Sequence, residues 1–108
     1  MRVKPDIVHC HSRRGADFPG GWGAKTAGVP AVVSRRVDNP ESPIAAWLRY
    51  RPFRKVIAVS ENVASALARS GVSNHRVTVI RDAVDIDVVN PDADRSCLRR
   101  FGVSDDSF

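Results

Sequence analysis

The sequence has few of the residues on which disulfide-rich and metal-binding proteins depend. Its two cysteines, Cys10 and Cys97, are far apart in a context typical of cytosolic proteins, so we expect no disulfide. Cys10 lies between His9 and His11, but this spacing is not that of a zinc site and no second cluster follows it. We therefore expect no metal ion, and we expect that the protein uses no cofactor.

Long apolar runs and nucleotide-binding motifs are also missing. No apolar run approaches the roughly 18 residues that cross a bilayer, and the start, MRVKPDIV, lacks the apolar core of a signal peptide, so we expect a cytoplasmic protein. No Walker A sequence occurs, and GGWG at 20–23 is not a dinucleotide fingerprint. The lack of a G-x-S-x-G elbow excludes an α/β-hydrolase.

The positive charge comes almost wholly from arginine. The chain holds 14 Arg and 3 Lys, and its net charge is +5. Guanidinium groups make two-pronged contacts with phosphate and carboxylate, which favours an anionic ligand, although a genomic preference for arginine explains the total equally well. The arginines form short pairs, and the aromatic residues do not alternate with basic ones on one strand face. We therefore expect no nucleic-acid partner.

Four short segments rich in Val and Ile predict a parallel α/β sheet with flanking helices. Segments of about 20 residues separate them, which is enough for right-handed βαβ crossovers. The predicted strands are residues 6–10, 31–34, 56–60 and 77–80. We expect helices at 42–50, 61–70 and around 93–101. Because Pro19 and several glycines interrupt the first crossover, we expect a loop over 13–21 and then a short helix at 22–27 that approaches the sheet closely.

Polar residues follow the predicted strands. Parallel strands end at one edge of a sheet, and open parallel sheets bind ligands there, so we expect one substrate-binding surface. Its candidate residues are His11, Arg13, Arg14, Arg35, Arg36, Asp38 and Arg81. Plainer explanations exist, since a histidine that ends a strand often bonds a neighbouring loop and one member of an arginine pair is usually solvated. Asp82 can be a turn residue.

The chain resembles family 4 of the glycosyltransferases in the order of four stretches. These are KPDIVHCHSRRGAD, AGVPAVVSRRVDNPE, VIAVSENVASALARSGVSNHRVTVIRDAVDID and NPDADRSCLRRFGV. The resemblance implies a retaining enzyme of the GT-B fold that uses a nucleotide sugar. It implies that HCHSRRGAD lines the acceptor side of the interdomain cleft, with His11 as the second histidine of the family's H-x-H. RDAVD departs from the frequent Pro-Asn-Gly-Val-Asp, because Arg81-Asp82-Ala83 replaces its first three residues.

The resemblance also implies that residues 1–108 are part of an N-terminal, Rossmann-like domain. We expect the first βα unit and the C-terminal nucleotide-sugar domain to be absent, and the chain alone to transfer no sugar. The acceptor would be a lipid or polysaccharide precursor of the cell envelope. The alternative is a non-catalytic Rossmann-like module that binds an anion or a partner chain. An incomplete domain leaves an uncovered sheet edge and an apolar face, so we also expect self-association.

Residues 45–55, AAWLRYRPFRK, interleave aromatic and basic side chains. Such a segment can lie on the surface of an anionic membrane, and for a cytoplasmic protein this would be the inner face of the membrane. The alternative, which we favour, is a helix that buries Trp47 and Leu48 against the sheet and leaves its arginines in water.

Overall fold

The structure is a computed structural model that describes residues 4–11, 15–86 and 101–102. The helix predicted around 93–101 falls almost entirely outside these residues. Among the described residues, no helix has both the length and the apolar character needed to cross a membrane.

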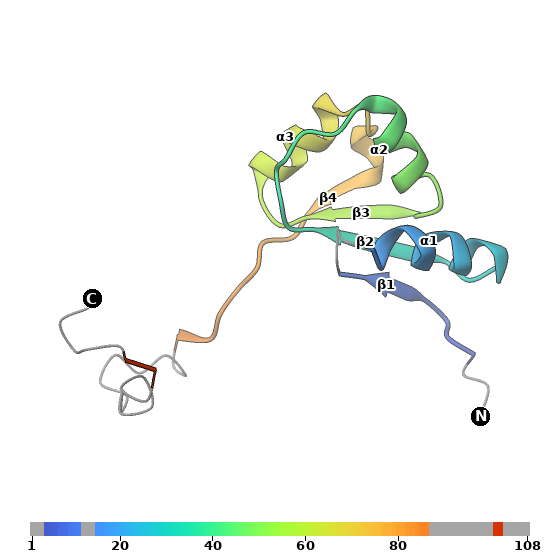
Figure 1. Cartoon of the computed structure of the whole chain (residues 1–108), viewed down its shortest axis with the longest axis horizontal. Coiled ribbons are helices and arrows are strands. Elements are labelled where there is room, and N and C mark those ends of the chain that lie inside the picture. The colour runs from blue at the N-terminus through green and yellow to red at the C-terminus, as the bar shows by residue number, and fades with distance from the viewer. Residues whose placement is uncertain (1–3, 12–14, 87–100, 103–108) are drawn as a thin grey trace.

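Four parallel strands form one sheet in the order β1-β2-β3-β4 (Figure 1). Each strand pairs in parallel with the one before it, so that Cys10 lies opposite Val33 and Arg35 opposite Ala58. The strands are β1 (Val8–Cys10), β2 (Ala31–Arg35), β3 (Lys55–Ala58) and β4 (Val77–Val79). This Rossmann-like arrangement confirms the predicted α/β fold class and all four strands, with bounds that shift by one or two residues.

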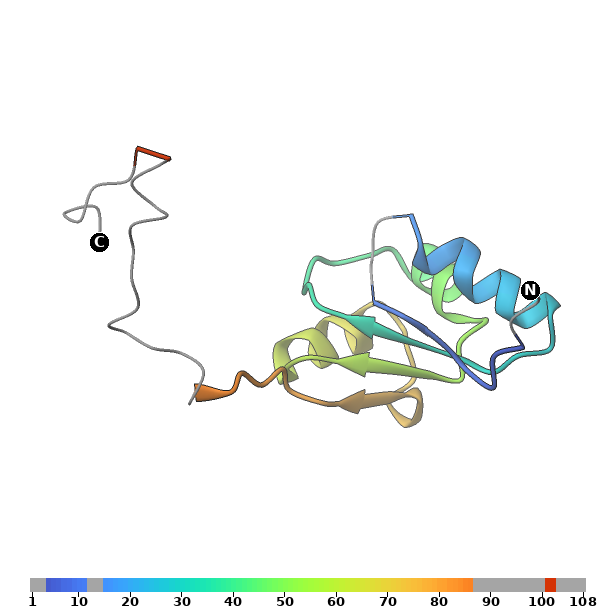
Figure 2. The same cartoon turned by 90° about the horizontal axis from the view of Figure 1, so that it is seen from below.

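Three helices make the crossovers: α1 (Asp17–Thr26), α2 (Pro43–Tyr50) and α3 (Glu61–Arg69). A 3-10 turn, Asn74–Arg76, precedes β4. In a parallel sheet whose strands follow one another in sequence, right-handed crossovers place every helix on the same face. After Val79 the chain leads away from the sheet as far as Ile86 (Figures 1 and 2).

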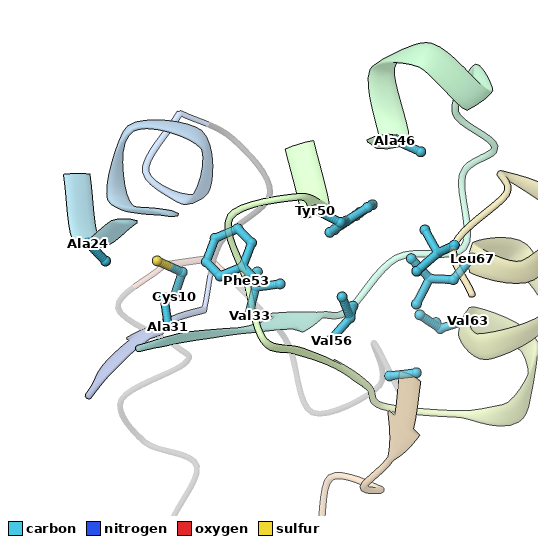
Figure 3. Close-up of a cluster of buried hydrophobic side chains, with 12 residues drawn as sticks. Cys10, Ala24, Ala31, Val33, Ala46, Tyr50, Phe53, Val56, Val63 and Leu67 are labelled. Atoms are coloured by element: carbon cyan, nitrogen blue, oxygen red, sulfur yellow. The ribbon is translucent and has the colours of Figure 1, made fainter. Parts of the chain in front are cut away.

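Because the helices cover only one face of the sheet, buried and more exposed side chains alternate along the strands. Cys10, Val33 and Val56 are buried beneath the helices, whereas His9 is exposed and Val32 is half-buried. In Figure 3, Cys10 lies near Ala24, and the Phe53 ring lies above Val33. Within the described residues, no helix or strand covers the opposite face of the sheet.

The loop predicted over 13–21 is wrong from Asp17 onward, where α1 begins. Pro19 lies in the first turn, where a helix needs no backbone N–H donor. The glycines lower helix propensity, but two of them allow the close approach that the sequence suggested. A Cβ atom at Gly20 would lie 2.8 Å from Cys10 Sγ, and one at Gly21 would lie 2.5 Å from the Phe53 ring.

Helices α2 and α3 occur where the sequence predicts them. Ser42 and Ser60 each accept a hydrogen bond from the backbone N–H three residues on, as N-caps do. Gly71, with φ of +83°, follows the end of α3.

The favoured burial of Trp47 and Leu48 is wrong. Helix α2 packs Ala46 and Tyr50 inward, while Trp47 is 57% exposed and Leu48 is 41% exposed. The reason is helical spacing, since Trp47 and Leu48 share the outer face with Ile44.

Candidate functional site

The carboxyl ends of all four strands meet at one edge of the sheet. The register fixes this geometry, because every neighbouring pair of strands is parallel. Polar residues gather at this edge, although Val37 and Ile80 also follow strands there. We call the following set of polar residues at or just beyond the strand ends the carboxyl rim: His11, Ser34, Arg36, Asp38, Arg81 and Asp82.

Two histidines lie side by side at the β1 end of the rim. The His9 and His11 ring centroids are 3.8 Å apart, with the rings tilted by 37°. His9 Nε2 is 2.8 Å from the Ser34 hydroxyl on β2. Cys10 points to the other face and is buried with a free thiol, as strand alternation predicts. The imidazoles are thus grouped on the uncovered side of the sheet.

His9 is biased toward its neutral form. Burial lowers the pKa of His9, and the neighbouring His11 lowers it further, because two imidazolium ions repel each other. A neutral imidazole can donate at one nitrogen and accept at the other. This is the protonation state that a proton acceptor or a ligand for a sugar hydroxyl requires.

A salt bridge at the carboxyl rim links the segments that follow β2 and β4, and so spans the end of β3. Arg36 Nη1 lies 2.6 Å from Asp82 Oδ2, and these residues follow β2 and β4, which are not neighbours in the sheet. Both side chains are about half exposed, so the pair contributes at most about 1 kcal/mol to stability. A ligand anion can therefore compete for the Arg36 guanidinium at little cost.

Arg35 points inward, although the sequence predicts that it contacts substrate. The residue is 2% exposed, and its guanidinium donates to the backbone carbonyls of Val37 and Asn39. It also bonds Tyr50 Oη at 2.6 Å and Glu41 Oε2 at 2.5 Å. The loop that carries Arg36 and Asp38 thus folds around the Arg35 side chain, which shapes the rim from within.

Arg35 belongs to a network of alternating charges that links β2, α1 and α2. Glu41 accepts from Tyr50 Oη at 3.0 Å and pairs with Arg49 Nε at 3.0 Å. Arg49 Nη1 reaches Asp17 Oδ2 at 2.9 Å. Two guanidinium groups and two carboxylates balance one another, as buried charges must.

The network shifts the titration of Arg49, Glu41 and Tyr50. Burial lowers the pKa of Arg49, but the hydrogen bond to Asp17 and the charge of Glu41 outweigh it, so this pKa lies above its ordinary value. Burial raises the pKa of Glu41, but the hydrogen bond from Tyr50 and the charges of Arg35 and Arg49 outweigh it, so the pKa lies below its ordinary value. Burial, opposed by Arg35 and supported by Glu41, raises the pKa of Tyr50 to about 12. Glu41 is therefore ionised and Tyr50 neutral near pH 7.

The structure brings some of the predicted site residues together and separates others. His11, Arg36, Asp38 and Arg81 are exposed beyond the strand ends, while Arg35 lies in the core. Arg13 and Arg14 lie outside the described residues.

The pattern of the sequence did not predict one group of interacting residues, which consists of Asp17, Glu41, Arg49 and Tyr50. One signal was available, because Arg49 and Tyr50 follow Ala46 at helical spacing and so belong to or border the buried face of α2. Polar groups at such positions need partners, and the carboxylates of Asp17 and Glu41 lie at the starts of the crossovers.

Two cavities lie away from the rim. One, of about 310 Å³, runs between α3 and the free edge of β4, and the other, of about 210 Å³, lies at the amino ends of the strands. Among the described residues, no group of three or more His, Cys, Asp and Glu side chains could hold a metal ion.

Comparison with known protein families identifies the chain. Residues 1–88 match the family described as Glycosyltransferase Family 4. No match was found among curated proteins. The four-stranded parallel sheet with its three helices is consistent with part of a GT-B fold. Because the family match covers most of the chain, the protein belongs to glycosyltransferase family 4 and is a glycosyltransferase-like module.

Proposed function

We propose that the chain supplies the acceptor side of a glycosyltransferase that moves a sugar from a nucleotide-sugar donor to an acceptor hydroxyl. The carboxyl rim is the acceptor site. The observation that carries this proposal is the position of His11 and Arg36, which leave neighbouring parallel strands at the same edge in a chain of this family.

The reaction has a simple atom balance. The acceptor oxygen bonds to the anomeric carbon, the bond from that carbon to the diphosphate oxygen breaks, and the nucleoside diphosphate leaves with the electron pair. The acceptor hydroxyl passes its proton to an oxygen of the departing diphosphate. The family resemblance implies retention at the anomeric carbon, so attack and departure occur on the same face of the sugar.

The rim residues have separate roles in this proposal. The exposed His11 imidazole orients the acceptor or the reacting sugar through a hydrogen bond. Arg36 and Arg81 attract an acidic or phosphorylated acceptor, and Asp82 holds Arg36 in place until the acceptor arrives. Arg35, Glu41 and Tyr50 fix the loop and do not touch substrate.

We further propose that the 108-residue chain turns over no sugar alone, as part of an N-terminal Rossmann-like domain. The resemblance assigns the residues that neutralise the leaving diphosphate to a second domain, and this charge stabilisation is usually the largest contribution to such catalysis. The purified chain should release no nucleoside diphosphate from a panel of nucleotide sugars. Release above background would contradict this part of the proposal.

The acceptor role is tested by supplying the nucleotide-binding half. The chain is joined to the nucleotide-binding domain of a family 4 enzyme, and transfer to that enzyme's own acceptor is measured. His11→Ala should lower kcat/KM about tenfold or more, because orientation of the reactants is lost. His75→Ala is the matched control, since His75 is an exposed histidine near the opposite edge of the sheet.

Two results would contradict the acceptor role. Equal kcat/KM in the His11→Ala and His75→Ala fusions would remove His11 from the site. A folded fusion that binds anions at the rim but never transfers sugar would favour the non-catalytic module.

A further inference from the structure

The outer faces of α1 and α2 expose large apolar side chains at helical spacing. On α2 these are Ile44, Trp47 and Leu48, of which Ile44 is 80% exposed. On α1, Phe18 is exposed and Trp22 half-buried one turn further on, with the two rings 6.4 Å apart. Monomeric soluble proteins usually scatter such residues singly, so two adjoining stripes indicate a contact surface.

The two stripes form one surface. Trp22 Nε1 on α1 donates to the backbone carbonyl of Leu48 on α2 at 3.3 Å. Both tryptophans of the chain lie on this surface, which we call the α1–α2 surface and define as Phe18, Trp22, Ile44, Trp47 and Leu48.

A cation accompanies each tryptophan. Lys25 Nζ lies 4.9 Å from the Trp22 ring centre, and Arg51 Cζ lies 4.7 Å from the Trp47 ring. Lys25 also lines the 210 Å³ cavity together with Arg54, and the described residues that line this cavity include no Asp or Glu. Cations thus border the apolar surface on both helices.

Acidic residues are lacking around this surface. The sequence has no Asp or Glu from 18 to 37 or from 42 to 60. The carboxylates nearest to these segments in the chain include Asp17 and Glu41, which the internal network already neutralises. The exposed charge beside the apolar side chains is therefore positive.

We propose that the α1–α2 surface docks on an anionic lipid bilayer. Tryptophan is favoured at the boundary between headgroups and acyl chains, where its ring is apolar and its N–H is polar. Lys25, Arg51 and Arg54 would meet lipid phosphates, and each cation near an anionic surface strengthens binding. Charge complementarity favours this occupant over a second copy of the chain, whose identical surface would repel it. This inference does not depend on the proposed function.

Vesicle sedimentation of the full 108-residue chain tests the proposal. The chain should sediment with vesicles of phosphatidylcholine and phosphatidylglycerol in equal parts, and more weakly with phosphatidylcholine alone. Binding should weaken as salt is added. Tryptophan fluorescence emission should shift to shorter wavelength, because Trp22 and Trp47 both move from water into the boundary between lipid headgroups and acyl chains.

Paired variants separate the two contributions. Lys25→Gln with Arg51→Gln should weaken binding about tenfold or more, whereas Lys4→Gln with Arg69→Gln removes the same charge elsewhere and should have a smaller effect. Ile44→Ser with Trp47→Ser should also weaken binding about tenfold, and Val84→Ser with Ile86→Ser should not. All of these side chains are exposed, so circular dichroism should show the same fold for each variant.

Three outcomes would overturn the proposal. They are no sedimentation with either vesicle, equal binding by each variant and its control, and a dimer in solution that Ile44→Ser with Trp47→Ser dissociates. A protein that binds vesicles but transfers no sugar in the fusion leaves this inference intact and contradicts only the proposed function.

Discussion

At the scale of single residues, neighbouring side chains of one type have different roles. Arg35 and Arg36 are adjacent, yet Arg35 is buried among carbonyls, Glu41 and Tyr50, while Arg36 reaches Asp82 at the rim. Strand alternation explains the difference, because successive residues point to opposite faces. Arg36 is therefore a candidate for substrate contact, and Arg35 for shaping the loop that presents it.

The Arg35 network predicts different costs for two substitutions. Tyr50→Phe removes one hydroxyl and should lower the free energy of unfolding by about 1–2 kcal/mol. Glu41→Gln leaves the buried Arg35 and the partly buried Arg49 guanidinium groups with too little negative charge and should cost about 3 kcal/mol or more. Urea denaturation measures the free energy of unfolding of both variants. An equal loss of stability in the two would contradict the conclusion that Glu41 is the main counter-charge of the network.

The histidine pair predicts an observable titration. In proton NMR of the imidazoles, His9 should titrate below 6.5, because burial and His11 both disfavour its charged form. His11→Ala should raise the pKa of His9 without restoring the ordinary value, since burial remains. An unchanged His9 pKa in this variant would show that the two rings do not interact.

At the scale of elements, α1 shows how packing overrides propensity. Its sequence, DFPGGWGAKT, reads poorly as a helix, yet Gly20 faces Cys10 and Gly21 faces Phe53, where any side chain would collide. That benefit is invisible along the chain, because Phe53 arrives from a loop more than thirty residues away. The other two helices were predictable, since their serine caps and apolar spacing are local signals.

Substitution of two glycines in α1 separates packing from propensity. Gly21→Ala should destabilise the fold by about 1–3 kcal/mol, because its Cβ would overlap the buried Phe53 ring. Gly23→Ala meets open space and should stabilise the fold by about 0.5–1 kcal/mol. Thermal unfolding of the two variants compares them directly. Stabilisation by both would mean that α1 does not approach the sheet this closely.

At the scale of the whole molecule, the ionisable groups define a pH range of greatest stability. The pKa values of His9 and Glu41 are lower in the folded state, so the unfolded chain binds more protons and stability falls as pH drops below about 6.5 and further below about 4.5. Tyr50 has a raised pKa of about 12, so its contribution is complete below pH 10 and is lost as pH rises toward 12.

This dependence predicts a specific change in one variant. The free energy of unfolding, measured by denaturant titration across pH, should decline above pH 10 in the native sequence. Tyr50→Phe should reduce that decline. It should also reduce the part of the acid decline that comes from Glu41, because the Tyr50 hydrogen bond helps to hold the Glu41 pKa down. If stability declined as steeply above pH 10 in Tyr50→Phe as in the native sequence, groups other than Tyr50 would be the cause of the alkaline decline.

The sequence predicted the sheet and the edge of the candidate site, but it did not predict which face of the sheet the helices cover. The Val- and Ile-rich runs and their spacing were enough for parallel strands. Because Val32 and Val33 are both apolar, alternation alone could not show which face of β2 the helices cover, nor which arginine turns inward. The exposure of Trp47 could not be predicted for a similar reason, because the sequence does not show which aromatic side chains cover the sheet. Tyr50 and Phe53 are buried there, and Trp47 is exposed.

Backbone amide shift mapping tests most directly whether the carboxyl rim is the acceptor site. A phosphorylated sugar alcohol is titrated into the nitrogen-15-labelled chain, and the shifted amides are assigned. The account predicts that the largest shifts cluster at His11, Arg36, Asp38 and Arg81, and that Arg36→Gln reduces them. Shifts confined to the cavity beside Lys25 and Arg54, or to the groove between α3 and β4, would contradict it.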